Sequence, residues 1–415
     1  MHPTETASRL AAFDRRGAGS DAELRTARWL AAELQDAGRE VAIEPFWCRP
    51  NWALANAWHV ALGLAGSLLS VHSPRVGGAM ILVALLSLIS DGLFGSSLGR
   101  LLTPERASQN VIGLPPRETR DKRVRLVLTA NYDAGRLGLA YRDRSRAVLA
   151  PARRLTGGLG PGWIGWLAIF LVWMLVTALL RLGGQHGSAI GVAQLVPTVA
   201  LVLALAILLE LASSEFGPAA ADNGSGVAAV IYIARALDAA PPLEAAVEVV
   251  LTGAGDGSGI GLRRYLRRRR GVLRADNSVV VGIGACAAGQ PRWWQSDGAL
   301  VPVRHFAELR DLCRRMAEED PGLELAPARG RGSSPALPAR LAGVPSIAVG
   351  CLDRRGLVPN SHQATDTGDS PQSAAPDGIV EIGLLLTDAI DGYLARMEPA
   401  PPRQHTSARR LLGRA

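Results

Sequence analysis

Asp222-Asn223-Gly224-Ser225-Gly226 is a short polar stretch between a long apolar run and an Ala/Val-rich segment with helical periodicity. The stretch predicts a tight turn that holds a carboxylate at the start of a helix, where backbone N–H groups are unpaired. A carboxylate in this position suits a metal ion. We therefore expect a membrane-type part and a globular α/β part in one chain.

Apolar residues are too abundant for a single soluble domain. They make up 48% of the 415 residues, and the chain is long enough for a domain together with membrane spans. Residues 163–180 and 189–209 are nearly free of charge. Each is long enough to cross about 30 Å of hydrocarbon, which takes about 20 residues. We expect both segments to span a membrane.

Two further apolar segments, 52–71 and 77–94, are weaker candidates for membrane spans. Asn56 and His59 interrupt the first, and Asp91 lies near the end of the second. Buried core helices are the alternative interpretation. Their length and their content of Gly, Leu and Val favour spanning.

The distribution of arginine predicts how the spans are oriented. The first fifty residues are polar and contain no signal peptide, so the N-terminus is expected in the cytoplasm. Arginines cluster where the spans meet the large polar segments, whereas only Arg75 and Arg181 lie in the connecting turns. We expect a multi-pass protein of the inner (plasma) membrane with its soluble domain in the cytoplasm. The four cysteines have no paired spacing, which agrees with a reducing compartment.

The net charge of +8 comes almost entirely from arginine, with Lys122 the only lysine. We interpret this bias as genomic composition rather than nucleic-acid binding, because no aromatic-stacking motif accompanies the basic residues. The densest basic run comprises Arg263, Arg264 and Arg267 to Arg270. A solvated helix face and a contact with anionic lipid head groups both explain this run, and such a contact contributes about 1 kcal/mol per charge.

The apolar segments divide the polar sequence into three pieces. Because each apolar hairpin returns the chain to the side it left, the pieces can assemble into one domain beside the membrane. The expected segments are 1–50, the first part of the domain; 51–95, the first transmembrane hairpin; 96–160, the second part; 161–212, the second hairpin; 213–397, the remainder of the domain; and 398–415, a disordered basic tail.

Short apolar runs alternate with helical patterns in the polar pieces. This alternation predicts an α/β domain with a mainly parallel sheet flanked by helices. Strands are expected at 40–46, 124–130, 246–251, 279–282 and 346–349. Helices are expected at 22–37, 227–237, 305–318 and 378–395.

A set of short motifs falls at the ends of these strands. They are, in chain order, Arg16-Gly17-Ala18-Gly19-Ser20, Asn110-Val111-Ile112, Asn131-Tyr132-Asp133, Asp222-Asn223-Gly224-Ser225-Gly226, Gly253-Ala254-Gly255-Asp256 with Gly261, and Asn360-Ser361-His362-Gln363-Ala364-Thr365-Asp366-Thr367. Each motif is weak alone, but the ordered set resembles the co-catalytic di-zinc aminopeptidases, whose relatives include glutamate carboxypeptidase and glutaminyl cyclase. The resemblance covers nearly all the soluble sequence and not the hairpins.

The resemblance implies a metal site with only part of its residues. In that family a His-x-Asp, a bridging Asp, a Glu-Glu pair, a later Asp and a final His bind two zinc ions, and the first Glu is the general base. Carried over by position, Asp222 matches the bridge, Asp256 replaces the liganding Glu and His362 matches the last histidine. These three would serve one metal, so at most one zinc ion is implied, and no bound metal is an equally open expectation.

The other positions of the family site have changed. Asn131 stands where the first histidine is expected, and Gly255 stands where the base is expected. Gly282 or Gly284 occupies the place of the later aspartate. Asp133, which would orient the missing histidine, is left to hydrogen-bond the backbone or Asn131.

Peptide hydrolysis needs a metal to activate water and a carboxylate to move the proton, and glycine supplies neither. We therefore expect a degenerate cleft, a pseudoenzyme, with a binding or scaffold role toward a peptide or protein partner. A membrane-bound mono-zinc peptidase or amidohydrolase acting on peptides is the alternative. Simpler explanations also stand for single residues: a helix cap for Asp222, an Asx-turn for Asp256 and a structural role for His362. A third hypothesis places the function in the spans, with Asp91 and Gln194 as the polar groups to test.

Overall fold

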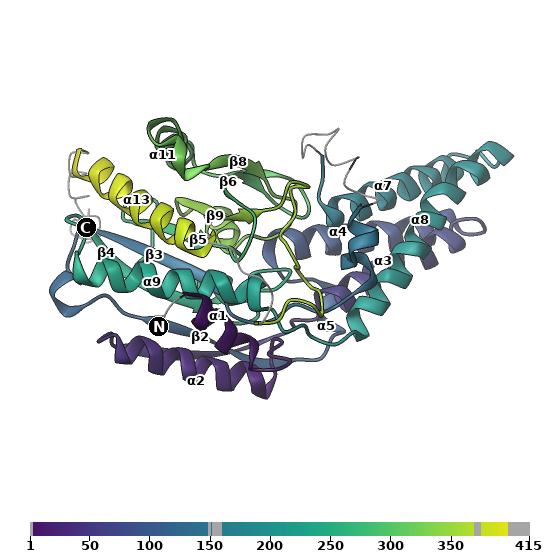
Figure 1. Cartoon of the computed structure of the whole chain (residues 1–415). Coiled ribbons are helices and arrows are strands. Elements are labelled where there is room, and N and C mark those ends of the chain that lie inside the picture. The colour runs from purple at the N-terminus through teal and green to yellow at the C-terminus, as the bar shows by residue number, and fades with distance from the viewer. Residues whose placement is uncertain (1–2, 148–150, 152–159, 369–374, 397–415) are drawn as a thin grey trace, which may run out of the picture.

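The computed structural model describes residues 3–147, 151, 160–368 and 375–396, and the expected basic tail, 398–415, lies outside this range. The chain forms an α/β domain from which four long helices project as a bundle (Figure 1). The helices of this helix bundle are α3 (Trp52–Leu69), α4 (Pro74–Phe94), α7 (Trp163–Leu182) and α8 (Ser188–Ser213). Strands from all three polar pieces of the sequence join one sheet.

The sheet is mixed rather than mainly parallel. Its nine strands within the described residues follow the order β1-β2-β4-β3-β5-β9-β6-β7, with β8 beside β6. The strands are β1 (Val41–Cys48), β2 (Arg106–Gly113), β3 (Val124–Asn131), β4 (Ala245–Thr252), β5 (Ser278–Ile283), β6 (Gln290–Asp297), β7 (Val303–Arg304), β8 (Ala326–Arg329) and β9 (Ser346–Leu352). The central strands β4, β3, β5 and β9 are parallel, as expected.

The expectation of a mainly parallel sheet is wrong for the two sides. β1 and β2 are antiparallel to each other, β2 is antiparallel to β4, and β6 is antiparallel to both β9 and β7. A parallel pair needs a crossover of a dozen or more residues that packs on the sheet. The β6–β7 connection is shorter than this, and the β1–β2 connection runs through α3 and α4, which leave the sheet (Figure 1).

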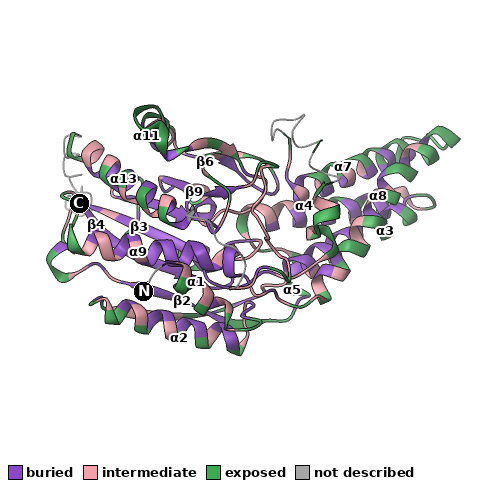
Figure 2. Ribbon diagram, viewed as in Figure 1, coloured by how far each residue is buried: buried purple, intermediate pink, exposed green. Residues whose placement is uncertain are grey.

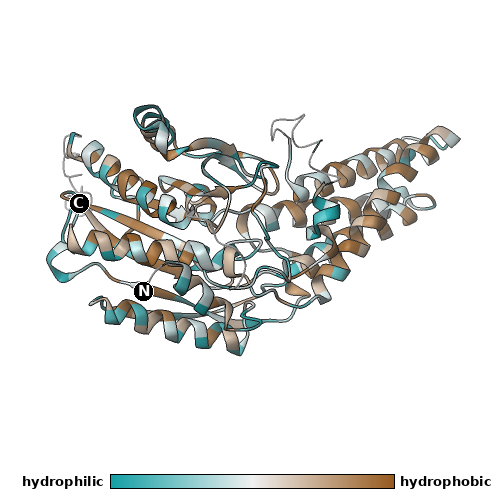
Figure 3. Cartoon of the chain, viewed as in Figure 1, coloured by the Kyte–Doolittle hydropathy of each residue, from teal (hydrophilic) through white to brown (hydrophobic). Residues whose placement is uncertain are grey.

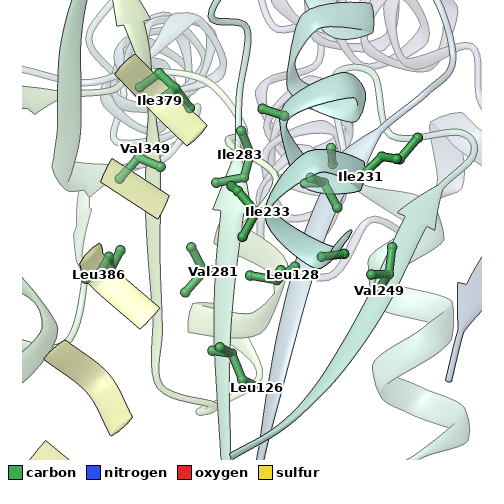
Figure 4. Packing of buried hydrophobic residues seen from close by; sticks show 14 of the residues in the cluster. Leu126, Leu128, Ile231, Ile233, Val249, Val281, Ile283, Val349, Ile379 and Leu386 are labelled. Carbon is green, nitrogen blue, oxygen red and sulfur yellow. The ribbon is translucent and has the colours of Figure 1, made fainter. Parts of the chain in front are cut away.

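Helices cover both faces of the sheet, because the side chains of the central strands are buried at nearly every position on both faces. The helices of the domain are α1 (Pro3–Ala11), α2 (Asp21–Asp36), α5 (Leu98–Leu101), α9 (Gly226–Ala239), α10 (Ile260–Arg268), α11 (Ala307–Glu319), α12 (Leu337–Leu341) and α13 (Ala375–Arg396). Leu126 and Leu128 of β3 point into the larger core, against α9 and α13 (Figure 4). Val127, between them, packs on the opposite face with Leu262 and Tyr265 of α10.

All four helices of the bundle are long and apolar enough to cross a membrane. Each packs mainly against two neighbours: α3 against α4 and α8, and α7 against the same two helices, while α3 and α7 also contact each other through Trp52 and Trp163. Their outward faces are exposed and hydrophobic (Figures 2 and 3). Small residues allow the close approach of α3 and α4, since a Cβ on Gly77 would lie 2.4 Å from the carbonyl oxygen of Gly66.

The polar groups inside the bundle have partners. The side-chain oxygen of Gln194 accepts two hydrogen bonds from Arg181, at 2.9 and 3.1 Å, and its amide nitrogen donates to Ser67. Asp91 forms a buried ion pair with Arg100, with an Oδ1–Nε distance of 2.5 Å. These contacts show that Gln194 and Asp91 join helices to one another, and a function of the spans stays a prediction.

Candidate functional site

The candidate site lies at the carboxyl ends of the parallel strands β3 and β4. Asn131 ends β3 and is paired in register with Thr252, which ends β4. The Thr252 hydroxyl donates a hydrogen bond of 2.8 Å to Oδ1 of Asn131. Asn131 is buried and stands where the resemblance expects the first zinc-binding histidine. Its side-chain oxygen is already engaged by Thr252.

Asp133 fixes the loop that follows β4. It is fully buried, and its two carboxylate oxygens accept hydrogen bonds from the backbone N–H groups of Gly255, at 2.7 Å, and Asp256, at 3.1 Å. Burial, and then the neighbouring Asp256 carboxyl, raise the pKa of Asp133 to about 7. Asp133 therefore serves the backbone of the loop, which agrees with one of the roles expected from the sequence.

Asp256 and His362 face each other across the site. Nε2 of His362 lies 3.5 Å from Oδ1 of Asp256. Nδ1 of His362 is 2.8 Å from the carbonyl oxygen of Arg136, so this nitrogen carries a proton and Nε2 is directed toward the carboxylate. The imidazole stacks on Tyr141 with 4.1 Å between ring centroids, and Oδ2 of Asp256 accepts the indole N–H of Trp52 at 3.2 Å.

Asp222 lies at the start of the segment Ala220–Ser225, immediately before α9. Its carboxylate accepts a short hydrogen bond from the hydroxyl of Ser361. Its backbone N–H and that of Ala221 donate to the buried carboxylate of Asp366, at 3.1 and 2.7 Å. Burial lowers the pKa of His362, but the carboxylates of Asp256 and Asp222 outweigh burial and raise it, so both carboxylates act on the same imidazole.

The residues fit a zinc ion only in part. Two ligands about 2.1 Å from one tetrahedral zinc lie about 3.4 Å apart, and the Asp256–His362 separation of 3.5 Å matches this value. However, no group of three or more His, Cys, Asp or Glu side chains within the described ranges is arranged to hold a metal ion. Asp222 is engaged with Ser361. Of the three metal ligands expected from the sequence, Asp256 and His362 thus lie at the separation of two zinc ligands, whereas the carboxylate of Asp222 is bonded elsewhere.

Gly255 and Gly282 leave no room for a side chain, whereas Gly284 does, since a Cβ on Gly284 would meet its nearest atom, the carbonyl oxygen of Val349, only at 3.7 Å. A Cβ on Gly255 would lie 2.2 Å from Cγ and 2.3 Å from Oδ1 of Asn131. A Cβ on Gly282 would lie 2.6 Å from the backbone nitrogen of Ala336. Atoms already occupy the place of the general base and, at Gly282, one of the two candidate places of the later aspartate.

Two buried charged residues that support the site were missed in the sequence. Arg16 is fully buried and donates to four backbone carbonyl groups, those of Leu10, Tyr132, Pro218 and Ala219. Glu23 accepts the N–H of Ala254 at 3.0 Å and that of Gly19 at 2.7 Å, and the hydroxyl of Ser108 at 2.8 Å. Glu23 had a local signal, because Ser20 caps α2 and Glu23 stands three residues later, as in a capping box.

Glu23 is expected to make the stability of the domain fall as the pH rises. Burial, and then the Asp133 carboxyl, raise the pKa of Glu23 from 4.5 to about 8. The folded state therefore keeps a proton that the unfolded chain loses, so the stabilisation is complete below pH 4.5 and is lost as the pH rises through about 8. One proton gives a slope of at most about 1.4 kcal/mol per pH unit.

Thermal unfolding of the full chain in detergent between pH 5 and 9 measures this effect. Glu23→Gln removes one titrating group and should make the profile less steep, most clearly between pH 7 and 8, above the pKa of about 7 to which burial raises Asp133, whose carboxyl acts in the same direction at lower pH. Glu40→Gln is the matched control, because Glu40 is exposed and its hydrogen bond with Arg120 lowers its pKa, which leaves it ionised throughout this range. Equal slopes for Glu23→Gln and the unmodified chain would contradict the assignment.

Comparisons with known proteins agree with the geometry. Residues 210–386 match the model of Peptidase family M28. No curated protein matches the sequence. Among solved structures, the chain is similar to a Bacteroides thetaiotaomicron glutaminyl cyclase bound to N-acetylhistamine, with 11% identity, a TM-score of 0.52, and 94% of this chain and 96% of that chain covered.

Two further solved structures show the same fold. A Zn-dependent exopeptidase from Parabacteroides distasonis has 11% identity and a TM-score of 0.52, with 94% of this chain and 96% of that chain covered. A zinc aminopeptidase from Bacillus subtilis has 15% identity and a TM-score of 0.50, with 94% of each chain covered. The chain thus has the fold of zinc aminopeptidases and glutaminyl cyclases, and its residues 210–386 match Peptidase family M28, which confirms the resemblance predicted from the motifs.

Proposed function

We propose that this chain is a membrane-anchored, peptidase-like protein that binds peptide ends in its cleft and does not hydrolyse them. The observation that carries the proposal is the contact between Gly255 and Asn131. The base position has no side chain, and the space for one is filled by an asparagine that is hydrogen-bonded to Thr252. A general base contributes typically 10²–10⁴-fold to the rate. Among the described residues, the carboxylates around the cleft already accept other hydrogen bonds.

The neighbouring carboxylates have other tasks. Both oxygens of Asp133 accept backbone N–H groups, and Asp366 does the same for Ala221 and Asp222. Asp256 is shared between His362 and the indole of Trp52. None of them is placed to receive a proton from an attacking water molecule without giving up these bonds.

The cleft retains features that suit the amino end of a peptide. A small cavity of about 100 Å³ beside the site is lined by Asp256, Asp133 and the apolar rings of Trp52 and Phe216, and also by Arg106 and by Arg136, whose guanidinium stacks on Phe216. This volume is below the 300–1,000 Å³ of typical drug-sized ligand sites, so it accommodates one terminal residue rather than a long segment. The carboxylate of Asp256 is the group that would accept an ammonium, and the flanking rings offer apolar contact.

The second candidate function is hydrolysis with a single zinc ion. The Asp256–His362 separation favours it, because it equals that of two ligands of one tetrahedral zinc. Binding would require Asp222 to leave Ser361 and join the pair. The Asp256 carboxylate is one methylene shorter than the glutamate that the family uses, which limits its reach.

The arrangement also supports the proposed orientation. The domain lies at one end of the helix bundle, and Arg49, Arg100, Arg106 and Arg142 belong to the segments on that side, whereas Arg75 begins α4 at the far end (Figure 1). The positive-inside rule then places the domain in the cytoplasm. A reporter protein fused after Ala415 checks the side, and activity of a periplasmic reporter at this position would reverse the assignment.

The function is tested with the full chain purified in detergent. After incubation with zinc and desalting, we expect less than one zinc ion per chain by mass spectrometry and no hydrolysis of aminoacyl coumarin amides. Calorimetry should show binding of short peptides with a free amino end and not of the same peptides acetylated. Asp256→Asn should weaken this binding at least tenfold.

Asp36→Asn is the control, because it removes the same charge from an exposed position at the end of α2. One tightly bound zinc ion, together with aminoacyl hydrolysis that both Asp222→Ala and His362→Ala abolish, would replace the proposal by the mono-zinc hydrolase. Equal binding of free and acetylated peptides would reject the role assigned to Asp256.

A further inference from the structure

We propose that an anionic phospholipid binds in a cavity at the junction of the α/β domain and the helix bundle. This junction cavity has a volume of about 730 Å³ and is lined by parts of α4, the segment 95–101 and α10, with Cys48 and Arg49. It is separate from the cleft around Asp256 and His362. The inference depends on the bundle spanning a membrane and not on whether the cleft hydrolyses peptides.

One side of the junction cavity is basic. Its lining includes four arginines and one acidic residue, Glu105, besides the Arg100 that is paired with Asp91. The four are Arg49, Arg263, Arg264 and Arg267. None of the four forms an ion pair with any described residue. The hydrogen bonds that they donate go to backbone carbonyl oxygens.

The positive charges of these arginines therefore lie close together without an ion-pair partner of their own among the described residues, although Glu105 also lines the cavity. Arg263 donates to the carbonyl oxygens of Leu93, at 2.7 Å, and Ser258, at 2.9 Å, which are neutral acceptors, and the Asp91 carboxylate offsets only part of the effect of burial and of the neighbouring arginines. Burial, and then the charges of Arg100 and Arg267, lower the pKa of Arg263 to about 10. A bound phosphate diester would relieve this repulsion and take up the free guanidinium donors.

The other side of the junction cavity is apolar and continuous with the outward face of α4. Val83, Leu86 and Phe94 of α4 and Leu98 and Leu101 of α5 line it. These side chains are exposed; Leu86 is 57% and Leu101 63% exposed. In a bilayer such residues contact acyl chains.

The positions of the basic and the apolar side of the junction cavity along the bundle axis match the head group and the acyl chains of a phospholipid. α3 and α7 begin with Trp52 and Trp163, whose rings lie 4.8 Å apart, and α4 ends with Phe94 at the same end of the bundle. Aromatic residues at the ends of spans mark the level of the lipid head groups. Arg267 donates to the carbonyl of Phe94, so the basic side of the cavity lies at head-group level and the apolar side extends toward the acyl chains.

The basic side and the apolar side of the junction cavity together favour a phospholipid over simpler anions. Inorganic phosphate and nucleotides would leave the exposed leucines of α4 and α5 without a partner. A lipid with a neutral head group would leave the arginines without one. A diacyl phospholipid with a net negative head group satisfies both sides.

A lipid in this position would also tie the candidate cleft to the membrane surface. α10 begins at Ile260, four residues after Asp256, and Arg100 connects Asp91 of α4 with Ser258 in the same loop. The loop that carries Asp256 is thus held between the basic helix and the bundle.

Native mass spectrometry of the full chain in detergent, titrated with phosphatidylglycerol or phosphatidylcholine of the same acyl chains, tests the proposal. Phosphatidylglycerol should bind at least tenfold more tightly. Arg264→Gln/Arg267→Gln should weaken phosphatidylglycerol binding by about 30-fold, which corresponds to about 2 kcal/mol for two charges, and should leave phosphatidylcholine binding unchanged. Both side chains are exposed, so the variant should fold, and its thermal unfolding is measured alongside.

The matched control, Arg28→Gln/Arg315→Gln, removes two exposed arginines from α2 and α11 and should bind phosphatidylglycerol like the unmodified chain. Leu86→Trp narrows the apolar side without changing charge and should also weaken phosphatidylglycerol binding, which keeps the test decisive if the arginine variant is unstable. Equal affinity for the two lipids, equal losses in the control variant, or displacement of phosphatidylglycerol by millimolar inorganic phosphate would each overturn the proposal.

Discussion

Asp91→Ala is expected to lower the free energy of unfolding by about 3–5 kcal/mol, because it leaves the Arg100 guanidinium buried without its counter-charge. The side chains of Arg100 and Asp91 are only 4% and 2% exposed. Oδ1 of Asp91 accepts from Nε of Arg100 and Oδ2 from Nη2, at 2.5 and 3.2 Å, and Ser97 donates a third hydrogen bond. This two-point contact loses all its acceptors in the alanine variant.

The same substitution should loosen the attachment of the bundle to the domain. Arg100 also donates to the carbonyl of Arg49, at 2.7 Å, and to the hydroxyl of Ser258. Denaturant unfolding of the detergent-solubilised chain gives the stability change. Asp14→Ala breaks the exposed pair with Arg15 and should cost less than about 1 kcal/mol.

Combining Asp91→Leu with Arg100→Leu should recover part of the loss, since a buried ion pair replaced by apolar side chains is often neutral. A change for Asp91→Ala no larger than that for Asp14→Ala would show that the buried pair does not hold the junction.

The central strands were predictable because their own residues carry the signal. β3, β4, β5 and β9 are largely apolar runs, interrupted by a charge only at Arg125 and Glu248, which is typical of strands covered on both faces, and each lies within a few residues of its expected range. β2 and β6 were missed, because Arg106–Gly113 and Gln290–Asp297 are largely polar and, apart from the two-residue β7, the strands that pair with them lie far away in sequence. Long-range pairing, rather than local composition, makes these segments strands.

The candidate site, too, was predictable where the residues themselves carry the signal and not where contacts between distant segments decide. The motifs located Asp222, Asp256 and His362, and the fold brings Asp256 and His362 within 3.5 Å. The contacts that decide their chemistry were not predictable from the motifs. Trp52 reaches Asp256 only because the bundle packs beside the β4 loop, and Tyr141 reaches His362 from another polar piece of the chain.

Gly255→Ala is the second substitution with a large expected effect, about 3 kcal/mol of destabilisation, at the upper end of the range for overpacked sites. The new Cβ would lie 2.2, 2.3 and 2.7 Å from Cγ, Oδ1 and Cβ of Asn131. Asn131 is buried and bonded to Thr252, so it has no open space to enter. Displacing the loop instead would break the hydrogen bonds of Asp133 to Gly255 and Asp256.

A double variant separates the steric clash with Asn131 from other causes of the destabilisation by Gly255→Ala. Asn131→Gly removes all three clashing atoms, so Gly255→Ala should cost less than about 1 kcal/mol in the Asn131→Gly background, and the difference between the two backgrounds is the coupling energy. Gly38→Ala is a poor control because of its positive φ of 85°, whereas Gly378→Ala on α13 meets no atom within 4 Å and should leave stability unchanged or slightly raised.

The same contact determines what is needed to restore a general base. Gly255→Glu alone should leave aminoacyl hydrolysis undetectable, because its side chain would have to pass through the position of Asn131. Only variants that also shorten Asn131 open the route from residue 255 toward the Asp256–His362 pair. Hydrolysis gained by Gly255→Glu in the presence of Asn131 would show that the loop moves freely. The loss of the glutamate side chain alone, rather than the filling of its space by Asn131, would then account for the missing base.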